Sequence, residues 1–200
     1  LVLYILTIKI SEVRKEISQK EYKEKISNLK KLPDLIDQTL KCESEIQVIA
    51  KDIHKSKGII FLGRGPSFPI ALEGALKLKE LSYLHAEGYP AGEMKHGPLA
   101  LIEEGLPVII LAPQDRYFEK TISNMQEVIA RGGKVLLITN QENNIISENI
   151  RFSLVIPKTD YHLTSFLTTI PLQLLAYHIA SLKNLDIDKP RNLAKSVTVE

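Results

Sequence analysis

The sequence has a single cysteine, Cys42, and no tryptophan among its 200 residues. One cysteine excludes an intrachain disulfide framework, a cysteine-based zinc cluster and an iron–sulfur ligand set. It fits a reducing compartment, and we expect a cytoplasmic protein. Charge of one sign is also scarce, because 26 Lys and Arg against 24 Asp and Glu leave a net charge of only +2. This balance offers no electrostatic footprint for nucleic acid, and no nucleic-acid partner is expected.

Long uninterrupted hydrophobic runs are missing too. The apolar opening, Leu1–Ile10, meets Lys9 and then Glu12 and Arg14. A membrane span needs ~20 apolar residues, and a secretory signal needs a basic region and a cleavage site. We find neither here, and no later stretch that looks long enough to span, so no membrane partner is expected. Because the run starts without Met, N-cap or turn, we expect a core helix cut from something longer.

What is present is the composition of an ordinary globular domain, with 44% hydrophobic and 25% charged residues. A chain of this length hides ~70% of the surface that its unfolded form exposes, and it is long enough for roughly one domain. Residues 1–56 are predicted to be helical, because their apolar residues recur at helical spacing and no β-branched run interrupts them. Pro33 and Asp34 mark a break and a restart within this segment.

The pattern changes at Gly58, where short apolar runs begin to alternate with helical stretches. Continuous apolar character predicts strands buried on both faces of a parallel sheet. We therefore expect an α/β layered fold with right-handed crossovers over 57–184, followed by a short polar tail over 185–200. The predicted strands are 58–63, 107–112, 134–139 and 152–156, with a possible fifth near 85–89, and the predicted helices are 70–84, 117–130 and 161–183.

A glycine-rich turn, Gly63-Arg-Gly-Pro-Ser67, follows the first strand and opens a helix. Glycines let backbone N–H groups approach an anion, and Ser67 would suit the N-cap of that helix. The turn fits a phosphate cradle and an ordinary tight turn equally well. It matches neither a dinucleotide fingerprint nor a P-loop.

The helix predicted over 70–84 carries one narrow charged stripe. At ~100° per residue, Glu73, Lys77 and Glu80 share a sector of roughly 60°. A surface helix normally devotes a wider face to polar groups, so the stripe suggests a cleft or an interface. A solvent-exposed ion pair of Glu73 with Lys77 is the alternative. Two carboxylates beside an ammonium are suited to setting the pKa of a general base.

The segment 85–98 is the densest polar stretch of the chain, with two His, two Glu and one Lys among three Gly and two Pro. Titratable residues interleaved with Gly and Pro mark a shaped loop, where functional groups often lie. His96, followed by Gly-Pro, is the main candidate, although a well-packed connection is the alternative. The spacing of Glu87, Glu93 and His96 matches no zinc or di-metal pattern, and no metal is expected.

Four segments together resemble the C-terminal part of the glutamine–fructose-6-phosphate amidotransferase (glucosamine-6-phosphate synthase) family. The resemblance implies a sugar-isomerase (SIS) fold, with a five-stranded parallel sheet flanked by helices. It also implies that 57–184 is the second of two tandem SIS subdomains and that residues 1–15 end the first. The segments are 61–67, 71–83, 85–102 and the terminal Pro190-Arg-Asn-Leu-Ala-Lys-Ser-Val-Thr-Val-Glu200.

The resemblance also implies roles for individual residues. Glu80 matches the base that moves a proton between C1 and C2, and Lys77 matches a lysine that assists proton transfers. His96 matches a histidine that opens the sugar ring from the neighbouring subunit, which implies a homodimer. Lys195, an ordinary surface lysine on residue type alone, matches the lysine that forms a Schiff base. Ala194 matches a neighbour whose backbone touches substrate, and no cofactor is implied.

The implied reaction makes glucosamine 6-phosphate from fructose 6-phosphate and ammonia. In the family, an N-terminal glutaminase domain supplies the ammonia, and Ser/Thr-rich loops of the first SIS subdomain hold the sugar phosphate. Neither part is present here, and Cys42 does not match the glutaminase nucleophile. We therefore expect the fragment to be inactive alone. The alternatives are a SIS module that senses a sugar phosphate, or another SIS sugar-phosphate isomerase or deglycase.

Overall fold

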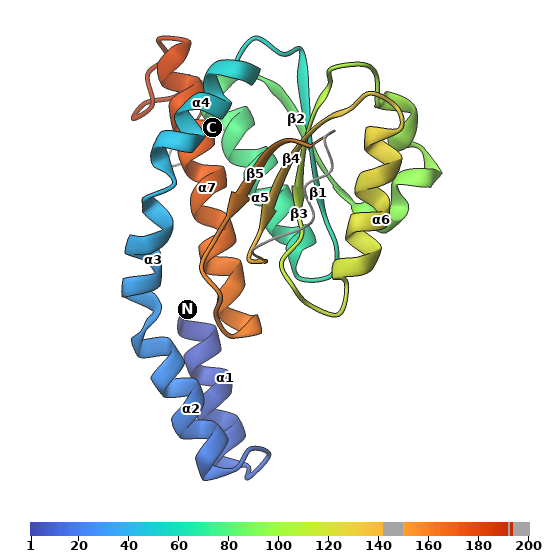
Figure 1. Ribbon diagram of the computed structural model, residues 1–200. Helices are drawn as coiled ribbons and strands as arrows, with labels where there is room; N and C mark the ends of the chain where they lie inside the picture. Colours follow the sequence, from blue (N-terminus) through green and yellow to red (C-terminus); the bar gives the residue numbers. More distant parts are fainter. Residues whose placement is uncertain (142–149, 192, 194–200) are drawn as a thin grey trace, which may run out of the picture.

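The computed structural model describes residues 1–141, 150–191 and 193, and its centre is a five-stranded sheet (Figure 1). All strand pairings are parallel, and the strands lie in the order β2-β1-β3-β4-β5. The predicted α/β class and the fifth strand are both confirmed. The strands are β1 (Gly58–Gly63), β2 (His85–Pro90), β3 (Pro107–Leu111), β4 (Lys134–Thr139) and β5 (Ile150–Val155).

Helices lie on both faces of the sheet. Those around it are α4 (Glu43–Ile53), α5 (Ser67–Ser82), α6 (Phe118–Ile129), α7 (Tyr161–Leu182) and the short 3-10 helices η1 (Ala91–His96) and η2 (Pro98–Leu101). On one face α5 packs against α7, and α7 in turn packs against α4. On the other face α6 contacts β3, β4 and η1. This arrangement explains the continuous apolar runs, because a central parallel strand must bury both of its faces.

The core consists of two clusters separated by the sheet. In β1, Ile59 and Phe61 join the cluster beneath α5 and α7, whereas Ile60 and Leu62 join the cluster beneath α6. The same alternation runs through β3 and β4. The expectation of burial on both faces is wrong for β5, where only Leu154 is buried. β5 is an edge strand paired with β4 alone, so part of each face meets solvent.

Helix α7 corrects the expectation that no stretch after the opening is long enough to span a membrane. By length and composition its 22 residues would suffice. Most of the helix is buried, however, against α5, α4 and α3 (Leu32–Leu40). α7 is thus the central helix of this core. It is apolar around most of its circumference because it has neighbours on several sides.

The N-terminal helices α1 (Val2–Val13) and α2 (Gln19–Lys30) extend away from the sheet (Figure 1). The Ser18 hydroxyl accepts from the Glu21 backbone, and the Glu21 carboxylate accepts from the Ser18 backbone. This capping box starts α2 at a fixed residue. Only Ile8 of α1 is buried, so the predicted opening helix forms with most of its apolar side chains exposed.

One side chain ties α1 to the start of α7. The Tyr4 hydroxyl donates to Asp160 Oδ1 at 3.4 Å, and Asp160 also accepts from the backbone N–H of His162 as the N-cap of α7. Burial, and then the charge of Asp160, raises the pKa of Tyr4 to about 12. The phenol therefore stays a neutral donor to the carboxylate.

An ionic cluster joins α4 to the sheet. The Asp52 carboxylate lies 2.6 Å from Lys134 Nζ and 3.2 Å from Arg151 Nη2. Burial acts to raise the pKa of Asp52, but hydrogen bonds from Lys134 and Arg151 outweigh it and hold that pKa below its usual value. Because these partners lie in β4 and β5, the cluster fixes the end of α4 against the edge of the sheet.

We expect Asp52→Asn to destabilise the protein by about 1 kcal/mol at neutral pH, since Lys134 and Arg151 lose a shared anion. A carboxyl whose folded pKa is lowered stabilises above its unfolded pKa and stops stabilising as pH falls through the folded value. The deficit of the variant should therefore shrink in acid. Urea unfolding at both ends of this range is the measurement, and an equal deficit at pH 7 and in acid would contradict it.

The glycine-rich turn after β1 is tightly packed. A Cβ on Gly63 would overlap the backbone of Ser67 and come within 2.7 Å of the Phe68 nitrogen. Gly65 has a φ of +54° and lies against the Tyr117 ring. The expectation that Ser67 caps α5 is wrong, because Pro66 occupies the N-cap and no side-chain cap bond forms. The glycines are therefore explained by close backbone approach in a tight turn.

Alanine substitutions at the two ends of β1 distinguish the close backbone packing at Gly63 from the general effect of replacing a glycine. We expect Gly63→Ala to cost about 2 kcal/mol or more, because the new methyl group meets rigid backbone. Gly58→Ala is the matched control: its Cβ would sit 3.5 Å from the nearest atom, which is ordinary contact. It should change stability by less than about 1 kcal/mol. Equal losses in urea unfolding of the two variants would refute the prediction.

Candidate active site

The charged stripe of α5 exists as predicted, opposite a buried face. Ala71, Ala75 and Leu78 are almost fully buried toward the sheet and α7. Because the helix is anchored along that face, its other face presents a fixed row of charges. Glu73, Lys77 and Glu80 make up that row, with partly exposed side chains.

Lys77 bridges the two carboxylates of the stripe. Its Nζ donates to Glu80 Oε2 at 2.7 Å and lies 3.9 Å from Glu73 Oε1. The hydrogen bond to Glu80 is the main cause that raises the pKa of Lys77; burial opposes it, and the charges of Glu80 and Glu73 add to it. The ammonium is thus held protonated. It can donate hydrogen bonds or stabilise negative charge beside the Glu80 carboxylate.

His96 is the last residue of η1, which carries it as a projecting group. Ala91 and Met94 of the same short helix are buried beside α6, whereas His96 and Glu93 are exposed. Nδ1 of His96 lies 2.8 Å from Glu93 Oε2. A carboxylate only accepts hydrogen bonds, so this contact places the proton on Nδ1 and leaves Nε2 facing solvent.

The structure does not bring all the predicted residues together. In the part of the chain that it describes, no hydrogen bond or ion pair joins His96 to Lys77 or Glu80. Ala194 and Lys195 lie outside the described residues. Within one chain, the stripe and the projecting histidine are two separate groups.

The last described turn does, however, come close to the stripe. The Tyr83 hydroxyl accepts the backbone N–H of Arg191 at 2.7 Å, and the Arg191 guanidinium lies 4.2 Å from the Tyr83 ring centre. Tyr83 follows α5 directly in a left-handed conformation and is three residues from Glu80. This contact could not be predicted from the sequence, because nothing in a tyrosine at a helix end indicates a partner 108 residues away.

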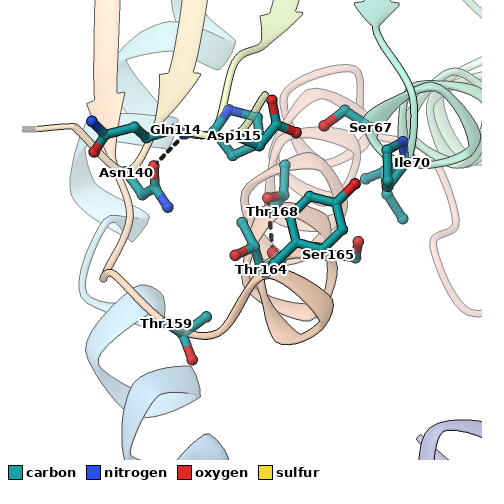
Figure 2. A pocket seen from close by; sticks show the side chains of 12 residues that line it. Ser67, Ile70, Gln114, Asp115, Asn140, Thr159, Thr164, Ser165 and Thr168 are labelled. Carbon is teal, nitrogen blue, oxygen red and sulfur yellow. Dashed lines mark hydrogen bonds between the residues drawn. The ribbon is translucent and has the colours of Figure 1, made fainter. Parts of the chain in front are cut away.

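A pocket that the sequence analysis did not predict lies at the carboxyl end of the sheet (Figure 2). It sits where the loops after β1 and β3 diverge, because β2 lies on one side of β1 and β3 on the other. Ligands of open α/β sheets often bind at such a switch point. The pocket encloses about 90 Å³, and its polar lining includes Ser67, Gln114, Asp115, Asn140, Thr164 and Ser165.

The lining of this pocket combines hydroxyl, amide and carboxylate groups. Figure 2 shows the Ser67 hydroxyl and the Asp115 carboxylate facing one another across it. Ser67 is only 7% exposed, and its hydroxyl has no hydrogen-bond partner among the described residues. Asn140 Oδ1 accepts from the Gln114 backbone at 2.7 Å, which fixes two of the loops.

Comparison with known proteins identifies the architecture. A family model described as "SIS domain" matches residues 52–183. A "Glutamine--fructose-6-phosphate aminotransferase [isomerizing]" from Aquifex aeolicus is 50% identical over 198 residues, which are 99% of this chain and 32% of that protein. The corresponding protein of Brucella melitensis is 50% identical over 98% of this chain and 32% of its own length. The chain spans about a third of the length of these curated relatives.

Solved structures agree with this assignment. The C-terminal domain of glucosamine-fructose-6-phosphate aminotransferase from Francisella tularensis has a TM-score of 0.90 and 40% identity, and it covers 94% of this chain and 53% of that chain. A glucosamine-6-phosphate deaminase from Thermotoga maritima has a TM-score of 0.66 and 26% identity over 94% of this chain and 52% of that chain. The matched model, the parallel sheet and these neighbours agree, and the chain belongs to the SIS domain family.

Proposed function

We propose that this chain is the ketose-isomerising half of a glutamine–fructose-6-phosphate aminotransferase. The observation that carries the proposal is identity of about 50% to such enzymes along nearly the whole chain. The substrates are fructose 6-phosphate and ammonia, and the product is glucosamine 6-phosphate. The reaction belongs to cytoplasmic amino-sugar metabolism.

In this proposal the stripe on α5 carries out the proton transfers. Ammonia replaces the C2 oxygen of the open-chain ketose as an imine, and water leaves. Glu80 then takes a proton from C1 and returns one to C2, while the proton of the C1 hydroxyl passes to the imine nitrogen, which leaves an aldehyde at C1 and an amine at C2. Lys77, held protonated 2.7 Å from Glu80, assists by donating to the sugar oxygens.

Two further groups act before this isomerisation. His96 opens the sugar ring, with Nε2 as the group that takes and returns the proton. Its separation from Lys77 and Glu80 within one chain supports a role across a homodimer interface. Lys195 adds to the C2 carbonyl to form a Schiff base, which ammonia then displaces, and the backbone of Ala194 contacts the substrate.

The organisation of the chain fits a piece of this larger enzyme. We propose that 57–184 is the second SIS subdomain, that 185–200 is the catalytic tail, and that 1–56 links it to a first SIS subdomain. The exposed apolar side chains of α1 support a neighbour on that helix. The remaining partners are an N-terminal glutaminase domain and a second subunit.

Borohydride trapping tests the role of Lys195 in the full-length protein. With fructose 6-phosphate present, reduction should fix a hexitol phosphate on Lys195, which peptide mass spectrometry locates. Glu80→Gln is the informative companion: it should still trap the adduct but lose product formation by at least about 100-fold, because the Schiff base precedes the proton transfer. An adduct confined to other lysines would refute the role.

The small pocket at the carboxyl end of the sheet favours one alternative, a SIS module that senses a sugar phosphate on its own. The two functions differ in what the 200-residue chain binds. Because the phosphate-holding loops of the family lie in the first subdomain, we expect titration calorimetry with fructose 6-phosphate to detect no binding tighter than about 1 mM. Submillimolar affinity of the isolated chain would favour the sensing module.

A further inference from the structure

We propose that Arg64 is a positioning residue that holds η1, and with it His96, in place. The inference rests on the proposed function for the role of His96, but its geometry is independent of that role. It accounts for the arginine of the glycine-rich turn, which the tight-turn argument leaves unexplained. Arg64 is not itself in contact with the reacting groups; it acts through the short helix that carries His96.

The Arg64 side chain crosses from the turn after β1 to helix α6. Its Nη1 donates to Asn124 Oδ1 at 3.3 Å. Asn124 is only 7% exposed, and its amide is held on α6 among core residues. This bond holds one nitrogen of the guanidinium against a buried residue of α6.

The same guanidinium lies against the backbone of η1 at Gly92. A Cβ built on Gly92 would be 3.0 Å from Nη1 and 3.2 Å from Cζ of Arg64, closer than ordinary contact. Gly92 thus leaves the space that the flat guanidinium fills. Because Arg64 contacts Gly92 and Asn124 at once, it links η1 to α6 through a planar group that lysine cannot reproduce.

Two other contacts also bind η1 to α6, and they show which part of η1 depends on Arg64. Lys95 Nζ lies 3.2 Å from Glu127 Oε1, which holds the end of η1 next to His96. Ala91 and Met94 are buried at the apolar cluster beneath α6. Arg64 therefore fixes the beginning of η1, and together the contacts set the direction in which the helix presents His96.

Displacing a proton-transfer group by ~1 Å can cost about 100-fold in rate. Displacement of His96 should therefore slow only the ring-opening step, in which His96 acts. A ketohexose 6-phosphate without its C5 hydroxyl cannot close a furanose ring, so 5-deoxyfructose 6-phosphate bypasses ring opening. A variant that merely destabilises the protein lowers activity on both substrates, whereas misplacement of His96 lowers it on fructose 6-phosphate alone.

The test compares Arg64→Gln, Arg64→Lys and Asn124→Ala with the exposed control Arg14→Gln in the full-length protein. We expect kcat on fructose 6-phosphate to fall by at least about 10-fold in the Arg64 variants and to change by less than about twofold on the 5-deoxy substrate. His96→Ala should show the same selectivity. Arg64→Gln and Asn124→Ala should be non-additive, because they remove one shared contact.

Hydrogen exchange of the 200-residue chain is the second measurement and needs no activity. Arg64→Gln should speed exchange in residues 91–97 by at least about 10-fold relative to Arg14→Gln, with β3 unchanged. Unchanged exchange there overturns the proposal, as do equal losses of kcat on both substrates. A wild-type enzyme inactive toward fructose 6-phosphate refutes the proposed function instead, and the exchange result still decides whether Arg64 positions η1.

Discussion

Burial of the central parallel strands on both faces is the constraint on which the rest of this structure depends. β1 and β3 place apolar side chains alternately into two clusters, so each face needs its own layer of helices. Among the described residues the buried polar side chains are all uncharged, so charged side chains are excluded from the middle of the domain. They gather at the ends of strands, on the outer face of α5 and on η1. The stripe, the projecting histidine and the small pocket all lie where the core ends.

The same constraint explains why the fold was largely predictable from the sequence. Strands 58–63 and 134–139 were predicted with the bounds they have, because short unbroken runs of Ile, Val and Leu between Gly and polar residues are typical of buried parallel strands. The burial of β5 was overestimated, since the position of a strand at the edge depends on the order of strands in the sheet and not on the strand's own sequence. The start of α5 was predicted at residue 70 but lies at Ser67, since the helix begins directly after Pro66 at its N-cap.

The candidate site was predictable only where its residues lie on the same helix. The spacing of Glu73, Lys77 and Glu80 gives their common face directly, and the structure adds which carboxylate Lys77 prefers. The contact of Arg64 with Asn124 joins residues 60 positions apart, and the pocket draws on the loops that follow four different strands. No local sequence pattern predicts such long-range contacts, because they depend on the order of the strands and on helix packing. The roles of His96 and Lys195 came from family resemblance alone.

The contact between Tyr83 and Arg191 closes a loop of 108 residues. Closing a flexible chain costs entropy that grows with the logarithm of its length, but the sheet and its helices have already brought these two ends together. A single tyrosine at a helix end thus joins the last described turn to α5 with little further loss of chain entropy.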